Sequence, residues 1–174
     1  MDGRIACPFC GGWNIPGVDV CVRCDHSLAE VSPQRPLSRV EQNLLRDRLQ
    51  ALGPRVPKVV PPDATVCEVL DQLVQEQIGC VLIVEDGELL GIFSERDALL
   101  KLGPDIAEHA YAPISDFMTP SVETLEADDS IVFALHKMDL GGFRHIPIYR
   151  DGEISGIVSV RDFLRYIADE LIGS

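Results

Sequence analysis

Four cysteines near the N-terminus have the spacing of a metal site. They form two Cys-x-x-Cys pairs, Cys7 with Cys10 and Cys21 with Cys24, and ten residues separate the pairs. Each pair can wrap a tight turn that points both thiolates at one ion, and two such turns complete a tetrahedral site. Zn(II) is the default metal for four thiolates in a reducing compartment. A closed site of this kind is structural, because no coordination position is left for chemistry.

The residues leave three alternatives to this zinc site open. Two disulfides would also use four cysteines, a single iron ion also fits four thiolates, and His26 could replace Cys24 as a ligand. The Cys-Pro-x-Cys-Gly-Gly stretch followed by the second pair resembles a zinc ribbon over residues 5–28, which implies fold and metal but no particular partner. A segment of about 30 residues buries too little surface to fold alone. We therefore expect the metal to hold residues 1–30 together.

A second pattern occurs twice in the chain. The stretch Gly-Ile-Phe-Ser-Glu-Arg-Asp at 91–97 returns as Gly-Ile-Val-Ser-Val-Arg-Asp at 156–162, an offset of 65 residues. The same offset aligns residues 63–102 with the second copy without a gap. Internal repetition of this length predicts a tandem repeat.

The duplicated motif carries a serine and an aspartate that could bind a sugar. Ser94 and Asp97 have the spacing of a helix capping box, which is the local interpretation. A carboxylate at a strand-to-helix edge can also accept from two vicinal hydroxyls, as a ribose requires, and a neighbouring serine reinforces the contact. The pairing of Ser94 and Asp97 with Ser159 and Asp162 favours this second function. Gly91 and Gly156 would let a ligand approach the backbone.

Each copy has the pattern strand, helix, strand, strand, helix. The predicted elements are extended segments at 56–60 and 122–125, helices at 66–77 and 131–140, strands at 80–84 and 145–149, Asp-Gly hairpin turns, a further strand, and helices at 95–102 and 160–171. One such repeat covers a single face of its sheet. We therefore predict an α/β (α+β) fold in which two repeats pair about a pseudo-twofold axis.

The segment between the cysteines and the repeats predicts a linker and a helix. Prolines at 33 and 36 mark a linker over 31–36. Apolar residues at helical spacing then predict an amphipathic helix over 36–52, with Arg39, Arg46 and Arg48 on its polar face. It is interpreted as a connecting helix packed on the main body, with a partner-docking helix as the alternative.

Taken together, the repeated motifs resemble the tandem CBS domain pair, or Bateman module, over about residues 56–171. The motif Asp-Phe-Met-Thr-Pro at 116–120 and the stretch Gly-Gly-Phe-Arg-His-Ile-Pro-Ile at 141–148 also carry the resemblance. It implies a dimer of pairs and an adenosine-containing ligand, such as AMP, ADP, ATP or S-adenosylmethionine, in the cleft between the repeats. The predicted organisation is a ribbon at 1–30, a linker and helix at 31–55, and CBS repeats at 56–112 and 113–174.

The resemblance also implies roles for single residues. Four of them match the ribose contacts of the family, two match basic phosphate contacts and two lie near ligand-facing loops: Asp97, Asp162, Ser94 and Ser159; Arg144 and His145; Thr65 and Ser130. The first copy has Gly79 and Cys80 where the second has Arg144 and His145. We therefore predict two unequal sites, of which the one near Arg144 prefers a phosphorylated ligand.

Charge and composition narrow the function. The net charge of −13 argues against a large nucleic-acid footprint, although residues 31–60 carry six basic and two acidic side chains. A secretory signal pattern and an apolar run of 18 residues are both missing from the sequence, which favours a cytoplasmic protein without a membrane segment.

The remaining cysteines and histidines offer no catalytic grouping. Cys67 and Cys80 are predicted to be buried in the core, and His109 and His136 to lie at the surface. Because no nucleophile has a matched base, we predict a protein that is not an enzyme. The predicted function is a regulatory sensor that signals through the ribbon to an unidentified protein partner. The alternative is a ligand-free scaffold that dimerises and presents paired ribbons to a protein or nucleic-acid partner.

Overall fold

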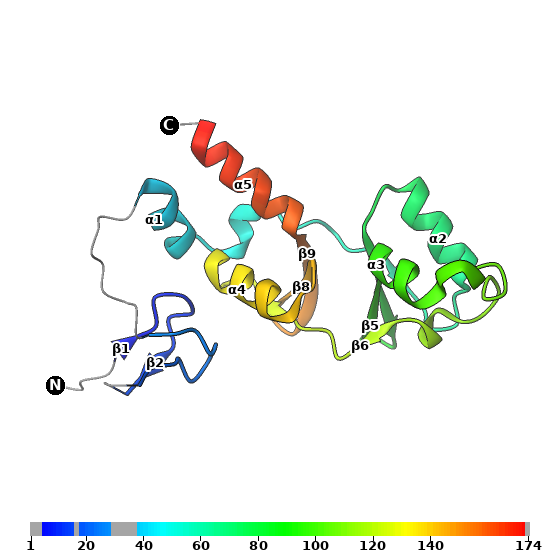
Figure 1. Ribbon diagram of the computed structural model, residues 1–174, viewed down its shortest axis with the longest axis horizontal. Coiled ribbons are helices and arrows are strands. Elements are labelled where there is room, and N and C mark those ends of the chain that lie inside the picture. The colour runs from blue at the N-terminus through cyan, green and yellow to red at the C-terminus, as the bar shows by residue number, and fades with distance from the viewer. Residues whose placement is uncertain (1–4, 16–17, 29–37, 173–174) are drawn as a thin grey trace. The chain divides into compact units, whose positions relative to one another are not determined.

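The chain folds into two compact units in the computed structural model, which describes residues 5–15, 18–28 and 38–172. The first-repeat unit is Val56–Glu123, and the second-repeat unit combines Met1–Arg55 with Thr124–Ser174. Figure 1 shows the chain entering the second-repeat unit twice, before and after the first repeat. The linker predicted at 31–36 lies outside the described residues. The domain boundaries after residues 30, 55 and 112 remain a prediction.

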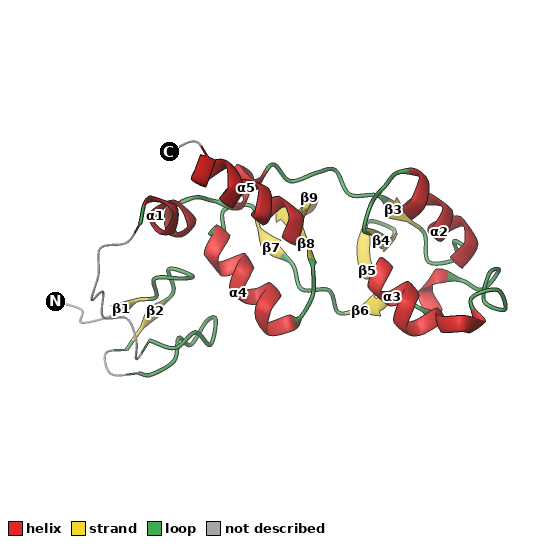
Figure 2. Ribbon diagram, turned by 45° about the horizontal axis from the view of Figure 1, so that its top comes forward, coloured by secondary structure: helices red, strands yellow, loops and turns green. Residues whose placement is uncertain are grey.

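A four-stranded sheet organises the first-repeat unit. Its order is β3 (Val59–Val60), β4 (Cys80–Glu85), β5 (Glu88–Ser94) and β6 (Thr119–Pro120), in which only β3 and β4 run parallel. Its helices are α2 (Val66–Gln75) and the short α3 (Glu95–Asp97), and Figure 2 shows both on the same face of the sheet. The helical segment predicted at 95–102 is present, but its second part, Ala98–Leu102, is a wider π-helical turn. Short 3₁₀ turns follow at Gly103–Asp105 and Ile114–Asp116.

The second-repeat unit repeats this plan. Strands β7 (Leu125–Glu126), β8 (His145–Arg150) and β9 (Glu153–Ser159) form its sheet, with β7 and β8 parallel. Helices α4 (Ile131–Gly141) and α5 (Val160–Ile172) pack with them around a core that includes Ile131, Ile146 and Phe163. The predicted order of elements and the mixed α and β class are confirmed.

The hairpin turns of the two repeats require positive φ angles, which the Asp-Gly pairs in the sequence predicted. Both central residues of each turn have positive φ: 49° at Asp86, 84° at Gly87, 53° at Asp151 and 84° at Gly152. This geometry matches the right-handed twist of the flanking strands. It brings Glu85 opposite Glu88 and Arg150 opposite Glu153, as the Asp-Gly pairs predicted.

The predicted helix at 36–52 is interrupted in the structure. Helix α1 spans Arg39–Arg46, and a separate 3₁₀ turn spans Leu49–Leu52. Asp47 is extended, and its carboxylate accepts a hydrogen bond of 2.6 Å from the Tyr166 hydroxyl on α5. The helix ends because Asp47 and Leu49 make backbone hydrogen bonds with the start of α4 instead. Residues 36 and 37 lie outside the described residues.

The predicted burial of Cys67 and Cys80 had opposite outcomes. Cys80 is buried in β4 as predicted, whereas Cys67 is exposed on α2, so its assignment to the core was wrong. Within the described ranges, no helix is both long and apolar enough to span a bilayer.

The hydrogen bond from the Tyr166 hydroxyl to Asp47 should stabilise the fold in a pH-dependent way. The hydrogen bond from Tyr166 is the largest influence on Asp47 and holds the pKa of that carboxyl below its usual range. A group with a depressed folded pKa stabilises the fold above its unfolded value, near pH 4, and loses that contribution as pH falls through the folded value. We expect Tyr166→Phe to lower the free energy of unfolding by about 1–2 kcal/mol at pH 7.

The same difference should shrink below about pH 4, as urea unfolding of both proteins at several pH values would measure. Tyr111→Phe is the matched control, because Tyr111 is 89% exposed. A pH-independent loss for Tyr166→Phe would contradict the assignment.

Candidate functional site

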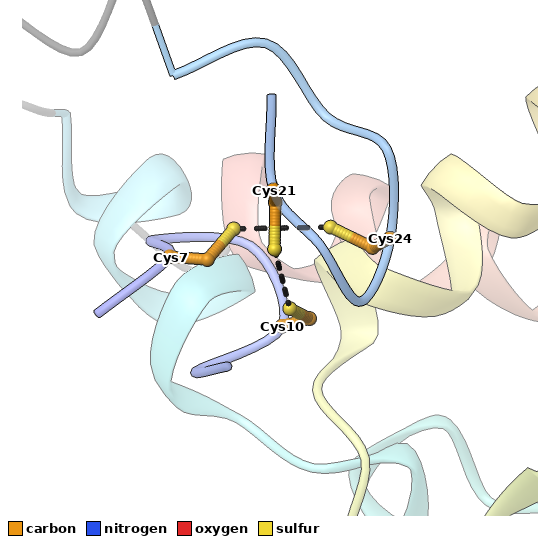
Figure 3. A group of neighbouring side chains, drawn as sticks. All are labelled: Cys7, Cys10, Cys21 and Cys24. Atoms are coloured by element: carbon orange, nitrogen blue, oxygen red, sulfur yellow. Dashed lines mark hydrogen bonds between the residues drawn. The ribbon is translucent and has the colours of Figure 1, made fainter. Parts of the chain in front are cut away.

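The four N-terminal cysteines converge on one point. Figure 3 shows their side chains pointing toward a common centre, and all four Sγ atoms lie within 4.8 Å of one another. The Sγ atoms of Cys7 and Cys24 are 3.8 Å apart, and those of Cys10 and Cys21 are 3.6 Å apart. A tetrahedron with zinc–sulfur bonds of about 2.3 Å has edges of about 3.8 Å. The donor set and its geometry therefore fit a tetrahedral thiophilic ion.

Neighbouring N–H groups support negative charge on the sulfurs. The amide of Gly12 donates to Cys10 Sγ at 3.4 Å, and the amide of Arg23 donates to Cys21 Sγ at 3.5 Å. Burial raises the pKa of Cys21, but the backbone amides of Arg23 and Cys24 and the side chains of Asn14 and Cys10 outweigh it and lower that pKa to about 6. Burial raises the pKa of Cys10 and of Cys24. Four ionised thiolates in this space therefore need a cation.

The structure does not show two of the alternatives that the sequence left open, namely two disulfides and His26 as a ligand. The separations of 3.6 Å and 3.8 Å are far longer than a disulfide bond of about 2.05 Å, and all four cysteines are free. Cys24, not His26, contributes to the cluster. The His26 ring instead stacks on Phe9, with the ring centroids 3.3 Å apart.

In the first-repeat unit, Asp97 is fully engaged by its own chain. Ser94 caps α3, and its amide donates to Asp97 Oδ2 at 2.9 Å, so the predicted capping box is present. The other oxygen, Oδ1, accepts from the Thr119 hydroxyl at 2.8 Å and pairs with Lys101 Nζ at 2.9 Å. Lys101 also donates to Thr119 and to the carbonyl of Phe117. All three ammonium protons of Lys101 therefore have acceptors.

In the second-repeat unit, hydrogen bonds reach only one oxygen of the matching carboxylate, and the other oxygen has ion pairs alone. Asp162 Oδ2 accepts from the amide and the hydroxyl of Ser159, at 2.8 Å and 2.7 Å. Asp162 Oδ1 accepts no hydrogen bond, although the residue is only 3% exposed. The guanidinium groups of Arg165 and Arg55 lie 3.2 Å and 3.6 Å from this oxygen. A buried acceptor with nearby positive charge is thus available to a hydroxyl donor.

The segments that run beside the two strands explain this difference between the copies. Thr119 lies opposite Ile92 of β5, and Arg55 lies opposite the matching Ile157 of β9. The Thr119 hydroxyl donates a hydrogen bond to Asp97, whereas Arg55 brings a guanidinium within 3.6 Å of Asp162. Both segments pack closely on a glycine, since a Cβ on Gly91 would meet Met118 Sδ at 2.5 Å and a Cβ on Gly156 would meet Pro54 Cβ at 2.7 Å. The close approach at these glycines is made by the chain itself.

The other predicted ligand residues lie in two different settings. Arg144 and His145 stand at the start of β8, where His145 pairs with Ser159 and the Arg144 carbonyl accepts from the Val160 amide at 3.0 Å. The fold therefore brings them to the same strand ends as Asp162. The hydroxyls of Thr65 and Ser130 are used within the protein: Thr65 caps α2 and bonds Glu68, and Ser130 donates to the Phe9 carbonyl at 2.7 Å.

Sequence reasoning overlooked several side chains at these carboxylates. Lys101 and Arg165 follow the two aspartates by four and three residues, so helical spacing could have found both. Thr119 and Arg55 come from distant segments, and their positions are related by strand pairing, since Thr119 lies opposite Ile92 and Arg55 opposite the matching Ile157. His136 was predicted at the surface, which is wrong, because its ring is half-buried and its Nε2 lies 2.7 Å from the Cys24 carbonyl oxygen.

Two β-α-β-β-α repeats with matching strand-to-helix turns define a tandem-repeat module, and comparison with known proteins names its family. The family model for the CBS domain matches residues 53–103 and 114–169, well over half of the chain. The chain belongs to the CBS-domain family.

Relatives and solved structures agree with this assignment. An uncharacterized 17.7 kDa protein of Acidianus ambivalens is 31% identical over 113 residues, which are 64% of this chain and 67% of the relative. The crystal structure of a CBS-domain-containing protein from Agrobacterium tumefaciens has a TM-score of 0.65 and 28% identity, and covers 69% of this chain and 98% of its own. The chain spans only 24% of the length of three Arabidopsis thaliana CBS proteins that it also matches.

Ligands are present in several of the similar solved structures. A CBS domain protein from Pyrobaculum aerophilum was solved as a complex with AMP. It has a TM-score of 0.60 and 26% identity, and covers 74% of this chain and all of its own.

The ion pair of Lys101 gives a direct test of the first-repeat geometry. Burial raises the pKa of Asp97, but hydrogen bonds from Ser94, Lys101 and Thr119 outweigh it and leave that pKa below its usual range. We therefore expect Lys101→Met to raise the Asp97 pKa, as an NMR titration of the side-chain carboxyl carbon would show. Lys137→Met, in the other unit, is the control that should leave it unchanged. An unaltered Asp97 pKa in Lys101→Met would refute the pairing.

Proposed function

We propose that this chain is a regulatory sensor that binds an adenosine-containing ligand at its second repeat. The observation that carries the proposal is the buried Oδ1 of Asp162, which lacks a hydrogen bond. The ion pairs with Arg165 and Arg55 offset part of the cost of burying this oxygen, and a ribose hydroxyl that donates to it would supply the missing hydrogen bond. The AMP bound by the Pyrobaculum aerophilum relative supports adenosine as the ligand class.

The surrounding groups suit a phosphorylated nucleoside. Ser159 lies beside Asp162 and fixes the orientation of its carboxylate through two hydrogen bonds. Arg144 is exposed at the neighbouring strand end, where a guanidinium can bind phosphate oxygens in a bidentate manner. Asp162 and Ser159 would thus hold the ribose, and Arg144 with His145 would contact the phosphate.

We propose that the first repeat is the weaker site. A ribose hydroxyl there would compete with Thr119 and Lys101 for Asp97 Oδ1, and displacing Lys101 would break three of its hydrogen bonds. Asp97, Ser94, Thr65 and Ser130 remain proposed ligand residues of lower affinity. AMP, ADP, ATP and S-adenosylmethionine remain the candidate ligands.

We further propose that the cysteine cluster binds one structural Zn(II) and that residues 5–28 form a zinc ribbon. Thiolate donors at tetrahedral spacing and amide donors to sulfur support zinc, with iron as the alternative metal. In this proposal the protein is cytoplasmic and not an enzyme, and the ribbon transmits the ligand state to a protein partner. A ligand must bind two conformations with different affinity for such regulation to occur.

The ligand proposal predicts different effects for the two aspartates. We expect AMP or ATP at millimolar concentration to raise the thermal midpoint of the metal-loaded chain, because a ligand that binds only the folded state stabilises it. Asp162→Ala should abolish this shift, whereas Asp97→Ala should retain most of it. Differential scanning fluorimetry would measure both variants beside the parent protein.

The opposite results discriminate between the candidate functions. A shift that survives in Asp162→Ala would remove the ribose assignment. Failure of AMP, ADP, ATP and S-adenosylmethionine to shift the midpoint would favour the dimerising scaffold. That scaffold could pair copies through Leu99 and Leu164, which match under the 65-residue offset and are 78% and 62% exposed. Sedimentation of a Leu164→Lys variant would then distinguish dimer from monomer.

The metal proposal predicts about one equivalent of zinc per chain in freshly reduced protein, because four buried thiolates complete one closed site. Cys21→Ser should reduce the content several-fold. Cys67→Ser, which changes an exposed cysteine outside the cluster, is the control and should retain the metal. Elemental analysis after desalting measures the content, and less than about half an equivalent in the parent protein would defeat the proposal.

A further inference from the structure

The two cysteine loops of the ribbon rest on one helix of the second repeat. The Ser130 hydroxyl donates to the carbonyl of Phe9, which lies between Cys7 and Cys10. The Nε2 of His136 lies 2.7 Å from the carbonyl oxygen of Cys24, and the acceptor makes this nitrogen the donor. Helix α4 therefore binds the backbone of both metal-binding loops, and Figure 3 shows it beside the loop that carries Cys24.

The contacts lie along the start of α4. Ser130, Phe133 and His136 follow one another at spacings of three residues, which places them on neighbouring positions of one face, and Asp129 directly precedes the N-cap Ser130. Arg23 contacts this part of the helix: its guanidinium pairs with Asp129 at 3.1 Å and lies 5.2 Å from the centroid of the Phe133 ring. Arg23 also donates to the Cys10 carbonyl at 2.9 Å. One side chain thus ties both cysteine loops to α4.

Apolar packing reinforces these polar contacts. Cys7, Cys21 and Cys24 are at most 2% exposed and belong to the same core cluster as Phe133 and Ala134. The metal-binding side chains are therefore part of the second repeat's core. These cysteine side chains stay buried in that core only while the ribbon is folded.

The ribbon's fold requires the metal. Its regular structure is limited to strands β1 (Ile5–Ala6) and β2 (Trp13–Asn14) among the described residues, and several of its large apolar side chains are exposed, including Trp13 at 65%. A segment this small has too little buried surface to be stable alone, and structural zinc supplies the missing stabilisation. Loss of the metal would remove the surface against which α4 packs.

The far end of α4 leads directly to the proposed phosphate contacts. The helix ends at Gly141, and Gly142 caps it with a φ of 62°. Only Phe143 separates this cap from Arg144 and His145 at the start of β8. A change in the position or order of α4 would therefore be transmitted to these two side chains over a few bonds.

We infer that the metal-loaded ribbon is a clamp on α4 and that metal binding and nucleotide binding at the second repeat strengthen each other. The inference rests on the proposed metal and ligand sites. Coupling through equilibrium binding is reciprocal, so the factor by which zinc raises nucleotide affinity equals the factor by which the nucleotide raises zinc affinity. His136 and Arg23 are positioning residues in this coupling, since they touch the ribbon backbone and neither the metal nor the nucleotide.

The test measures both directions of the coupling on the full chain. AMP affinity is determined by calorimetry with Zn(II) bound and after chelation, and zinc affinity is determined by chelator competition with and without AMP. We expect each affinity to change by about five-fold or more, by the same factor. His136→Ala should reduce the factor toward one while retaining one equivalent of zinc. His136→Gln, whose amide can still donate to the Cys24 carbonyl, should restore part of it.

A matched control and an independent measurement complete the experiment. Asp139→Ala changes an exposed position of α4 away from the ribbon contacts and should leave the factor unchanged. Hydrogen exchange of the amides in 131–145 tests the clamp without any nucleotide: zinc removal and His136→Ala should each increase exchange there. Unchanged exchange in both, or equal AMP affinity with and without zinc, would overturn the inference.

These outcomes are separable from failure of the proposed function. If AMP does not bind but exchange in 131–145 still depends on zinc, the ligand proposal and the coupling to AMP fail and the clamp stands. If AMP binds equally well in both metal states, the ligand proposal stands and the coupling fails.

Discussion

The first turn of α4 is the junction on which the second-repeat unit depends. Its N-cap residue, Ser130, is only 7% exposed and accepts from the Phe133 amide while it donates to the Phe9 carbonyl of the four-cysteine segment. The chain that follows α1 reaches the same turn, because the Leu49 amide donates to the Asp129 carbonyl and the Ile131 amide donates to the Asp47 carbonyl, both at 3.1 Å. Since a helix N-terminus leaves amides without intrahelical partners, separate segments can bond to it. The four-cysteine segment, the chain after α1 and the second repeat are joined there.

The two repeats show how a duplicated motif acquires unequal chemistry without a change in its backbone. Both copies place a serine at the helix cap and an aspartate three residues later. The segment that runs beside β5 brings Thr119, whereas the matching segment beside β9 brings Pro54 and Arg55. A hydroxyl satisfies one carboxylate oxygen, and its absence leaves the other oxygen available. Arg144 and His145, which the first copy lacks, predict unequal sites from the sequence, and the packing of distant segments is a second source of inequality between the copies.

Short-range patterns in the sequence predicted much of the fold. The hairpin turns, the order of elements and the cap at Ser94 follow from interactions within a few residues, which the local sequence encodes fully. The errors arose where distant contacts override local preference. The helix predicted over 36–52 ends at Asp47 because α4 and α5 offer hydrogen bonds there, and His136 contacts the Cys24 carbonyl because the four-cysteine segment packs on α4.

The sequence by itself determined that this chain contains a four-cysteine cluster and a tandem CBS repeat, because spacing within each motif fixes which atoms can converge. Tertiary structure alone decided which partner each group has. It placed Cys24 rather than His26 in the cluster, occupied Asp97 with Lys101, and left Asp162 with a buried oxygen that lacks a hydrogen bond. These outcomes depend on segments far apart in the chain, such as Thr119 and Asp97. Only the packed structure specifies which of their donors and acceptors meet.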